Sequence, residues 1–354
     1  MAFARGASAI WAIAGYTAVE ALQFLLIGRP LREEAQRTDA ITLFDWFSAR
    51  FDGGGSAVRL TGAAITVVFL TAYVAAQLTG GAKTLTAALG IPPFAALVLS
   101  LLLILAYMLL GGYVAVAWND VVRAVIMLFG LIALPAAAVA RLGGPQALLD
   151  KLAALDPGLP DPLAISAGAL IGFLGIGLGS PGQPHILVRY ISVDDPRNLK
   201  ISAVWGTVFN VLLGAGAVAS GMAGRALLGD AGALPGGDRE TVYLVLASDL
   251  FGPVLYGLLV GGVFAAILST ADSQLLVVAS TVARDIGERV LGRGKGGSAG
   301  ESLALSRRAL LLSAAAALLL AAAARDLVFW LVLFAWGGLG AALGPPLICG
   351  LWWR

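Results

Sequence analysis

The sequence predicts an all-α protein that crosses a membrane several times, and three observations support this class. Hydrophobic residues make up 59% of the 354 residues and charged residues only 12%, and the mean hydropathy is +0.90. Soluble domains are about 45–50% apolar and about 25% charged, so this chain has too few charges to cover a surface that faces water. The apolar residues also lie in long runs, and a helix needs about 17–25 of them to cross the hydrocarbon core of a bilayer.

Nine such runs are the predicted membrane spans. Runs such as 97–110 show no alternation of polar and apolar residues, which argues against the strands of a membrane β-barrel. The predicted spans are 7–28, 57–81, 93–112, 119–140, 163–187, 201–226, 252–281, 308–324 and 327–350.

Basic residues lie mainly on alternate loops, and this bias predicts how the chain sits in the membrane. Loop 29–59 and region 284–308 are the richest in Arg and Lys, whereas the loops on the opposite side hold fewer. Because basic loops tend to stay in the cytoplasm, we expect the N-terminus outside and the C-terminus in the cytoplasm. Segment 285–306 is rich in glycine, and we expect a flexible cytoplasmic linker there.

Segment 171–187, within the predicted span 163–187, carries five glycines and two prolines. Glycine frees the backbone, and proline removes a hydrogen-bond donor and clashes with the preceding turn. Irregular backbone at membrane depth is tolerated where it is buried in protein or lines a cavity, and broken helices mark transport sites. We therefore expect an unwound stretch near 177–184 whose carbonyls and amides face a cavity. The alternative is a glycine face for close helix packing, followed by an ordinary loop.

A second predicted span has polar residues in its middle. Hydroxyls at positions i+3 and i+4 of a helix lie beside the carbonyl of residue i, so Ala266 O, Ser269 Oγ and Thr270 Oγ1 should converge. Sodium is a hard cation, and hard cations take oxygen ligands. Three neutral oxygens would make half of a sodium site, with the other half on a different helix. The alternative is that these hydroxyls bond back to the helix and merely bend it.

Three acids, Glu20, Asp120 and Asp272, lie at or near membrane depth, where carboxylates usually face a cavity, a partner charge or an ion path. Asp120 is either an interface residue or an acid at the inner mouth of an ion route. The single histidine, His185, fits a hydrogen-bonded structural residue better than a ligand, because no His, Cys and carboxylate cluster accompanies it. The sequence therefore predicts no metal other than sodium and no cofactor. It also predicts no enzyme site, and the net charge of +2 argues against a nucleic-acid partner.

Several blocks resemble the sodium:solute symporter family, and within it the bacterial sodium/proline symporters. The blocks are GGYVAVAWNDVVRAVIMLFG (111–130), GLGSPGQPHILVRYISVDDP (177–196), FAAILSTADSQLLVVASTVARD (264–285), TLFDWFSARF (42–51) and FAWGGLGAALGPPLI (334–348). The resemblance implies a LeuT-like inverted-repeat fold with ten core helices in a bacterial inner (plasma) membrane. The nine spans then correspond to core helices two to ten, so we expect a single, partial transporter domain over 1–354 that lacks the first core helix and is incomplete at both ends.

The resemblance also implies roles for individual residues. Ala266, Ser269 and Thr270 would contribute to the sodium site, and Asp120 would help sodium to leave toward the cytoplasm.

The expected substrate-cavity residues come from two further stretches of the chain and from the span that carries the hydroxyls. They are Tyr73, Ile176, Ser180, Pro184 and Gln274. Ile176 and Ser180 stand where proline carriers of the family usually have aromatic residues. The transported solute could therefore differ from proline.

The resulting hypothesis is a sodium-coupled symporter that imports a small organic solute, with proline or a related amino acid favoured, by alternating access. The coupling ion and the solute are the expected partners, and the oligomeric state is left open. Two alternatives remain: a symporter-like sensory module of a larger signalling protein, and a non-functional fragment.

Overall fold

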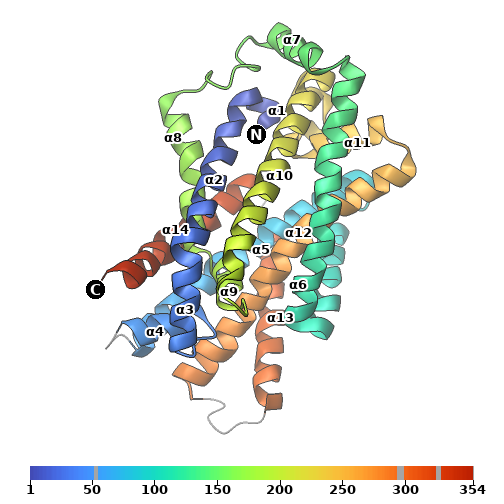
Figure 1. Cartoon of the computed structure of the whole chain (residues 1–354). Helices are drawn as coiled ribbons and strands as arrows, with labels where there is room; N and C mark the ends of the chain where they lie inside the picture. The colour runs from blue at the N-terminus through green and yellow to red at the C-terminus, as the bar shows by residue number, and fades with distance from the viewer. Residues whose placement is uncertain (52–54, 293–298, 324–327, 354) are drawn as a thin grey trace.

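The computed structural model describes residues 1–51, 55–292, 299–323 and 328–353. Within these ranges every regular element is helical and no strand is present. In chain order the elements are α1 (Ala2–Arg5), η1 (Gly6–Ala9), α2 (Ile10–Gln23), η2 (Phe24–Gly28), α3 (Arg29–Arg37), α4 (Leu43–Arg50), α5 (Gly55–Leu89), α6 (Pro93–Leu142), α7 (Pro145–Leu155), α8 (Ala167–Gly175), η3 (Ile176–Gly182), α9 (Pro184–Ile191), α10 (Asn198–Leu228), η4 (Ala231–Ala233), η5 (Pro235–Gly237), η6 (Arg239–Thr241), α11 (Val242–Leu250), α12 (Pro253–Ser280), η7 (Thr281–Val290), α13 (Ala299–Ala323) and α14 (Val328–Trp352). They form an elongated bundle with α7 at one end and α3 and α4 toward the other (Figure 1).

The nine predicted spans all coincide with apolar helices. Seven helical stretches in the described residues are long and apolar enough to cross a membrane, and the two remaining predicted spans match shorter apolar helices, Pro93–Leu109 and Ala167–Gly182. The seven are Ala2–Arg37, Ser56–Leu89, Val116–Leu142, Asn198–Leu228, Pro253–Val290, Leu303–Ala323 and Val328–Trp352. The prediction of an all-α, multi-span membrane protein is confirmed.

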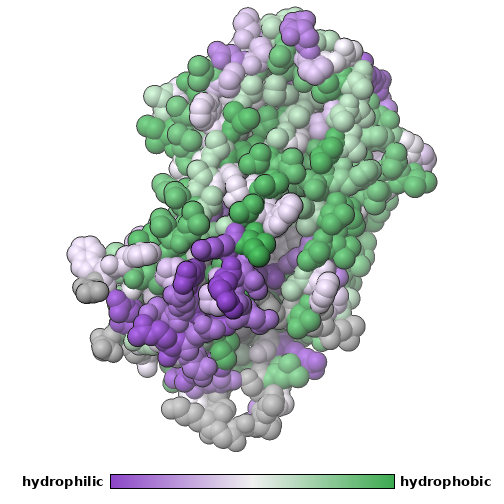
Figure 2. All heavy atoms as spheres, in the orientation of Figure 1, coloured by the Kyte–Doolittle hydropathy of each residue, from purple (hydrophilic) through white to green (hydrophobic). Residues whose placement is uncertain are grey.

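The surface of the bundle agrees with this class. Hydrophobic residues cover the flank of the visible face, whereas hydrophilic residues gather at the lower end over α3 and α4 and again near α7 (Figure 2). Large exposed apolar side chains such as Leu25, Trp118 and Leu312 belong to helices of the flank. An apolar belt between two polar ends is the surface that a bilayer requires.

The predicted spans 93–112 and 119–140 correspond to the two parts of α6, Pro93–Leu109 and Val116–Leu142. Its first part packs in one core with α5, α12 and α13, through Ile104 and Met108. Its second part packs in another core with α11 and α12, through Leu134.

The expected linker 285–306 is partly helical. Helix η7 extends to Val290, and α13 begins at Ala299. Residues 293–298 of this segment lie outside the described residues.

Helix α14 and the broken segment η3 touch through their backbones. Gly179 and Gly182 of η3 face Gly340 and Leu339 of α14, and a Cβ built on Gly182 would lie 2.6 Å from the Cα of Gly340 and would overlap the carbonyl of Leu339. Only glycine allows such an approach, because every other residue carries a Cβ. These glycines therefore set the position of the broken segment against α14.

We expect Gly182→Ala to lower the free energy of unfolding by about 1–3 kcal/mol, because its methyl meets backbone that cannot rotate away. Gly337→Ala on α14 is the matched control, since a Cβ there would meet nothing within 4 Å. Unfolding in detergent, followed by circular dichroism, measures both variants. Equal stability of the two variants would contradict the close contact.

A charged cluster joins the loop before α11 to the ends of α5 and α14. Lys83 Nζ lies 2.8 Å from Asp238 Oδ2 and 2.5 Å from Glu240 Oε2. The carboxylate of Glu240 also accepts hydrogen bonds from the backbone N–H groups of Val328 and Phe329, at 3.3 and 3.1 Å. These N–H groups are at the N-terminus of α14, where the first turn leaves backbone donors without partners in the helix. The carboxylate of Glu240 accepts from them, and its negative charge also complements the helix dipole.

A buried charge cluster holds α4 against α5 and η7. Arg59 donates to Asp45 Oδ1 at 2.9 Å and to Asp285 Oδ1 at 2.7 Å, and Arg284 Nε donates to Asp45 Oδ2 at 2.8 Å. Thr42 Oγ1 also donates to Asp285 Oδ1, at 2.9 Å. Burial acts to raise the pKa of Asp45, but the hydrogen bonds from Arg284 and Arg59 outweigh burial and hold its pKa below the usual value.

Candidate functional site

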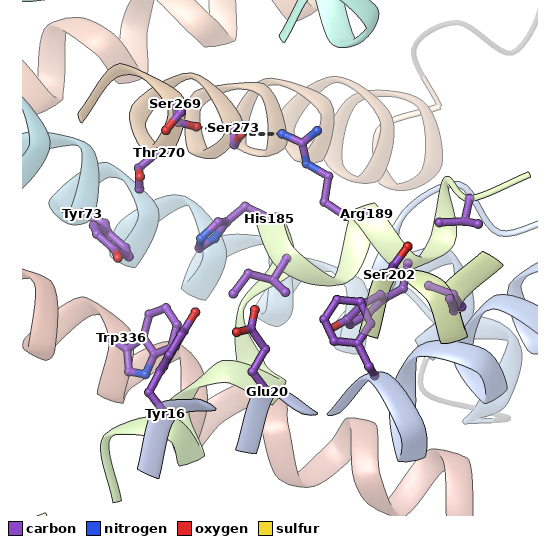
Figure 3. A pocket seen from close by; sticks show the side chains of 15 residues that line it. Tyr16, Glu20, Tyr73, His185, Arg189, Ser202, Ser269, Thr270, Ser273 and Trp336 are labelled. Atoms are coloured by element: carbon purple, nitrogen blue, oxygen red, sulfur yellow. Dashed lines mark hydrogen bonds between the residues drawn. The ribbon is translucent and has the colours of Figure 1, made fainter. Parts of the chain in front are cut away.

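A central cavity of about 470 Å³ lies between α2, α5, α9, α10, α12 and α14. Figure 3 shows polar groups entering it from several sides: Ser269 and Thr270 from α12, Tyr73 from α5, His185 from α9 and Glu20 from α2. A few polar groups that converge in an otherwise apolar pocket are typical of a small-molecule site.

The α12 wall of the cavity carries the predicted group of oxygens. Ser269 Oγ donates to Ala266 O at 2.8 Å, and Thr270 Oγ1 donates to the same carbonyl at 3.3 Å. The predicted convergence of the three oxygens is confirmed, and Ser269 and Thr270 both line the cavity. The alternative, in which the hydroxyls merely bond back to their own helix, predicts the same two hydrogen bonds. These bonds alone therefore do not distinguish a sodium site from ordinary back-bonding.

The broken helix is present where the sequence predicts it. Helix α8 ends at Gly175 and continues as the 3-10 turns of η3, Gln183 is extended (φ −91°, ψ 103°), and α9 begins at Pro184. The two prolines and the glycines explain the break, because Pro181 and Pro184 cannot donate to a preceding turn.

Side chains satisfy the carbonyls that the break releases. Trp336 Nε1 of α14 donates to Ile176 O at 2.9 Å, and Gln183 Nε2 donates to Gly179 O at 2.9 Å and to Trp336 O at 3.0 Å. We expected the carbonyls of this stretch to face a cavity, whereas these carbonyls are bonded within the protein. Buried backbone groups need such partners, so the side chains of Gln183 and Trp336 stabilise the irregular backbone.

Helix α9 brings a cation to the cavity. Arg189 lines the cavity and donates to Asp120 Oδ2 at 2.7 Å and to Ser273 Oγ at 2.8 Å (Figure 3). One guanidinium therefore connects α9 with α6 and α12. His185, one turn earlier, is buried with its ring edge-on to Tyr73, and the ring centroids are 5.9 Å apart.

Two of the three acids at membrane depth, Asp272 and Asp120, pair with arginine side chains. Asp272 is fully buried and accepts hydrogen bonds from Tyr107 at 2.6 Å and Arg123 at 2.7 Å. Asp120 pairs with Arg189 and lies 3.8 Å from Arg123. The third acid, Glu20, enters the central cavity, and its Oε2 is buried without a hydrogen-bond partner among the described residues.

The structure brings only part of the predicted substrate set to the central cavity. Tyr73 lines it, together with Ser269 and Thr270. Ile176 lies in a different cavity of about 570 Å³ beside α14, and Pro184 lines a third one beside α3 and α4. Ser180 and Gln274 are fully buried.

Sequence reasoning missed several residues that line the cavity. Glu20 was noted as an acid at membrane depth, and that signal could have placed it in the site. Arg189 and Trp336 gave no comparable signal, because a basic residue at a helix end and a tryptophan in a span both occur often at the membrane interface. Tyr16 packs against Trp336 with ring centroids 6.0 Å apart, and no local pattern predicts this contact.

A membrane helix bundle with a helix broken beside a central polar cavity defines a secondary transporter. The family model described as "Sodium:solute symporter family" matches residues 1–354, and the chain belongs to this family. It is a transporter of a family that uses Na⁺ as the coupling ion, not an enzyme.

Two relatives illustrate the family membership. The chain is 32% identical to the osmoregulated proline transporter OpuE of Bacillus subtilis (strain 168), over 99% of this chain and 71% of that protein. It is 33% identical to the sodium/proline symporter of Escherichia coli (strain K12), over 99% of this chain and 70% of the relative.

A solved structure has the same fold. The substrate-bound, outward-open state of a Na⁺-coupled sialic acid symporter superposes with a TM-score of 0.81 at 20% sequence identity, covering 100% of this chain and 74% of the other. The LeuT-like fold that the sequence blocks implied is thereby confirmed.

Proposed function

We propose that this protein is a sodium-coupled importer of proline or a closely related amino acid, and that it works by alternating access. The observation that carries the proposal is the central cavity, where the α12 oxygens at Ser269 and Thr270 face the helix that follows the break. The proline relatives, at about one third identity over almost the whole chain, support this choice of solute.

In this proposal sodium binds at Ala266 O, Ser269 Oγ and Thr270 Oγ1, with further oxygens from a second helix. The hydroxyls turn away from Ala266 O when the ion arrives, because a cation is a stronger partner for an oxygen lone pair than a weak back-bond. Asp120 acts later, on the route by which sodium leaves. Its present ion pair with Arg189 means that sodium has to compete with a guanidinium there.

In this proposal the membrane potential and the sodium concentration gradient together drive solute uptake. Moving one charge through 100 mV of membrane potential is worth about 2.3 kcal/mol. Coupling is reciprocal, so sodium that orders the cavity raises the affinity for solute, and solute raises the affinity for sodium by the same factor.

The arrangement in the membrane is part of the proposal. The end of the bundle with α3, α4 and η7 carries most of the basic residues and faces the cytoplasm of a bacterial inner membrane. The N-terminus of the chain then lies outside and the C-terminus inside, and 1–354 acts as a single transmembrane domain with segment 285–306 on the cytoplasmic side.

Uptake of labelled proline into proteoliposomes tests the proposal. We expect uptake to rise several-fold when sodium, rather than potassium, is the cation outside. A panel of unlabelled amino acids then ranks solutes by competition. Uptake that is the same with either cation would exclude sodium coupling.

The cavity acid gives a prediction about the solute. The buried Oε2 of Glu20 has no hydrogen-bond partner among the residues that the structure describes, and Tyr16, Tyr73 and Trp336 line the same cavity. A carboxylate beside aromatic faces suits the ammonium group of an amino acid. We expect Glu20→Gln to weaken proline binding by roughly tenfold, because a charge-assisted hydrogen bond contributes about 1.5–3 kcal/mol.

The matched comparison uses a different ligand with the same protein. Cyclopentanecarboxylate has the ring and carboxylate of proline but no amine, so its affinity should stay the same or improve in Glu20→Gln. Competition against labelled proline measures both ligands. If both affinities fall together, Glu20 does not contact the amine.

A further inference from the structure

A second cavity, separate from the central one, lies at the end of the bundle near α3 and α4. Its volume is about 630 Å³, within the range of about 300–1,000 Å³ that is usual for small-molecule sites. Helices α9 and α12 separate the two cavities. Val188 of α9 and Val277 of α12 line the second cavity, whereas Arg189 of α9 and Thr270 of α12 line the central one.

The wall of the second cavity is largely apolar. Leu43, Phe44, Val188, Leu276 and Val277 line it. Leu43, Phe44 and Val277 also belong to the largest buried core of the described residues, which joins α3, α4, α5, α9, α12 and α14. The apolar wall is therefore a part of the rigid core and not a loop.

This cavity is lined by an arginine, Arg32, that has no acid partner in the described ranges of the chain. Helix α3 carries three arginines, and two pair with acids of the same helix: Arg29 with Glu33 at 2.6 Å and Arg37 with Glu34 at 2.7 Å. The third, Arg32, has Ala35 and Gln36 at the i+3 and i+4 positions, where an acid could reach it.

Arg32 is partly buried and lines the cavity, and its Nε is buried without a hydrogen-bond partner in the described part of the chain. A buried donor of a charged group that lacks a partner costs at least about 1–3 kcal/mol, so an acceptor placed here binds with a free-energy gain.

The other charges at this cavity favour an anion. Arg284 lines it and uses its Nε for Asp45, which lies outside the lining. Asp39 is the acid in the lining, but it is exposed at the turn after α3, where water and salt screen its charge. The buried part of the cavity therefore combines guanidinium groups with an apolar wall.

We propose that the second cavity binds an organic anion with an apolar body, whose carboxylate or phosphate group contacts Arg32. The apolar body packs against Phe44, Val188 and Val277. A ligand of this chemistry can come from the bilayer, as a fatty acid, or from the cytoplasm, as a soluble aromatic or aliphatic acid. Because the ligand contacts the reverse faces of α9 and α12, its binding changes solute uptake through the central cavity.

Binding of two acids to the purified protein in detergent tests the proposal. Decanoate represents the membrane source, 3-phenylpropionate represents the soluble source, and decan-1-ol has an apolar body without charge. We expect Arg32→Gln to weaken the binding of the preferred acid by at least about tenfold. Arg37→Gln, on the same helix but paired with Glu34 and outside the cavity lining, should stay within about twofold of the wild type.

Two further variants make the outcome independent of folding defects. Arg32→Lys keeps the charge and should retain more affinity than Arg32→Gln. Val188→Phe leaves Arg32 in place but fills the cavity, so it should weaken the acids and decan-1-ol alike. Tighter binding of decanoate identifies the bilayer as the source, and tighter binding of 3-phenylpropionate identifies the cytoplasm.

Acid affinity that is the same in Arg32→Gln and the wild type would overturn the proposal, and so would an equal loss in Arg37→Gln. If Val188→Phe binds the acids with the affinity of the wild type, the ligand does not occupy this cavity. None of these results depends on proline uptake, so the proposal can fail while the transport function stands.

Discussion

Replacing Thr270 with alanine should raise the sodium concentration for half-maximal uptake by at least about tenfold. Thr270 Oγ1 lines the central cavity next to Ala266 O and Ser269 Oγ, and the variant removes one of the three oxygens. Changes in groups that merely support a metal ligand already cost about 10–100-fold in affinity, so loss of a ligand should cost no less. Sodium titration of labelled proline uptake in proteoliposomes measures the effect.

Two variants serve as controls for Thr270→Ala. Thr270→Ser keeps the hydroxyl and should remain close to the wild type. Thr79→Ala on α5 removes a hydroxyl that also donates to its own helix, from Thr79 Oγ1 to Ala75 O at 3.0 Å, but that lies outside the central cavity lining. If Thr79→Ala and Thr270→Ala shift sodium activation equally, the effect comes from helix geometry and the sodium assignment fails.

Replacing Arg59 with methionine should lower the free energy of unfolding by about 3–5 kcal/mol, the largest stability effect expected in this protein. The side chain of Arg59 is 10% exposed, and it bridges Asp45, at 6%, and Asp285, at 0%. Asp45 keeps Arg284 in the variant, whereas the hydroxyl of Thr42 is the one partner that Asp285 keeps within the described residues. Methionine keeps an unbranched chain in place of the arginine stem as far as Nε, so the loss reports chiefly the missing guanidinium group.

Reversible unfolding in mixed micelles measures this loss, with Arg37→Met as the control. The Arg37 side chain is 76% exposed, and exposed ion pairs contribute about 0–1 kcal/mol. Expression and insertion of both variants should be compared first, because a strongly destabilised membrane protein is degraded in the cell. A loss in Arg59→Met no larger than in Arg37→Met would falsify the structural role of the cluster.

The spans could be predicted because length and apolar content are properties of the local sequence. The broken helix at 176–183 was predicted for the same reason, since glycine and proline act on their own backbone. The meeting of Ser269 Oγ and Thr270 Oγ1 at Ala266 O required only helix geometry. In each case the interacting groups lie within a few residues of one another.

The contacts that complete the site could not be predicted in this way. Arg59 and Asp285 are separated by 226 positions, and Gln183 and Trp336 by 153, so their pairing depends on how helices pack. The orientation of the broken segment was missed for a different reason. A regular helix fixes which residues share a face, but a break resets the rotation, and Ile176 and Pro184 therefore point into other cavities than Tyr73 does.

Glu20 shows a third limit. An acid in an apolar run signals function, but it does not tell which of several candidates remains unpaired. Asp120 and Asp272 have the same sequence signal and are paired with arginines, whereas the buried Oε2 of Glu20 finds no partner among the described residues. That distinction required the positions of Arg123 and Arg189.

The backbone contact between η3 and α14 limits how this transporter can open. Gly182 and Gly340 bring the two backbones into contact. Trp336 of α14 donates to the carbonyl of Ile176, and Gln183 donates to the carbonyls of Gly179 and Trp336. Sliding one segment past the other would strand these donors and expose bare peptide groups, so the two travel as one rigid body during the transport cycle. The relative motion then falls on the other side of the cavity, where Arg189 of α9 bonds Ser273 of α12 and Asp120 of α6, hydrogen bonds that can be exchanged one at a time.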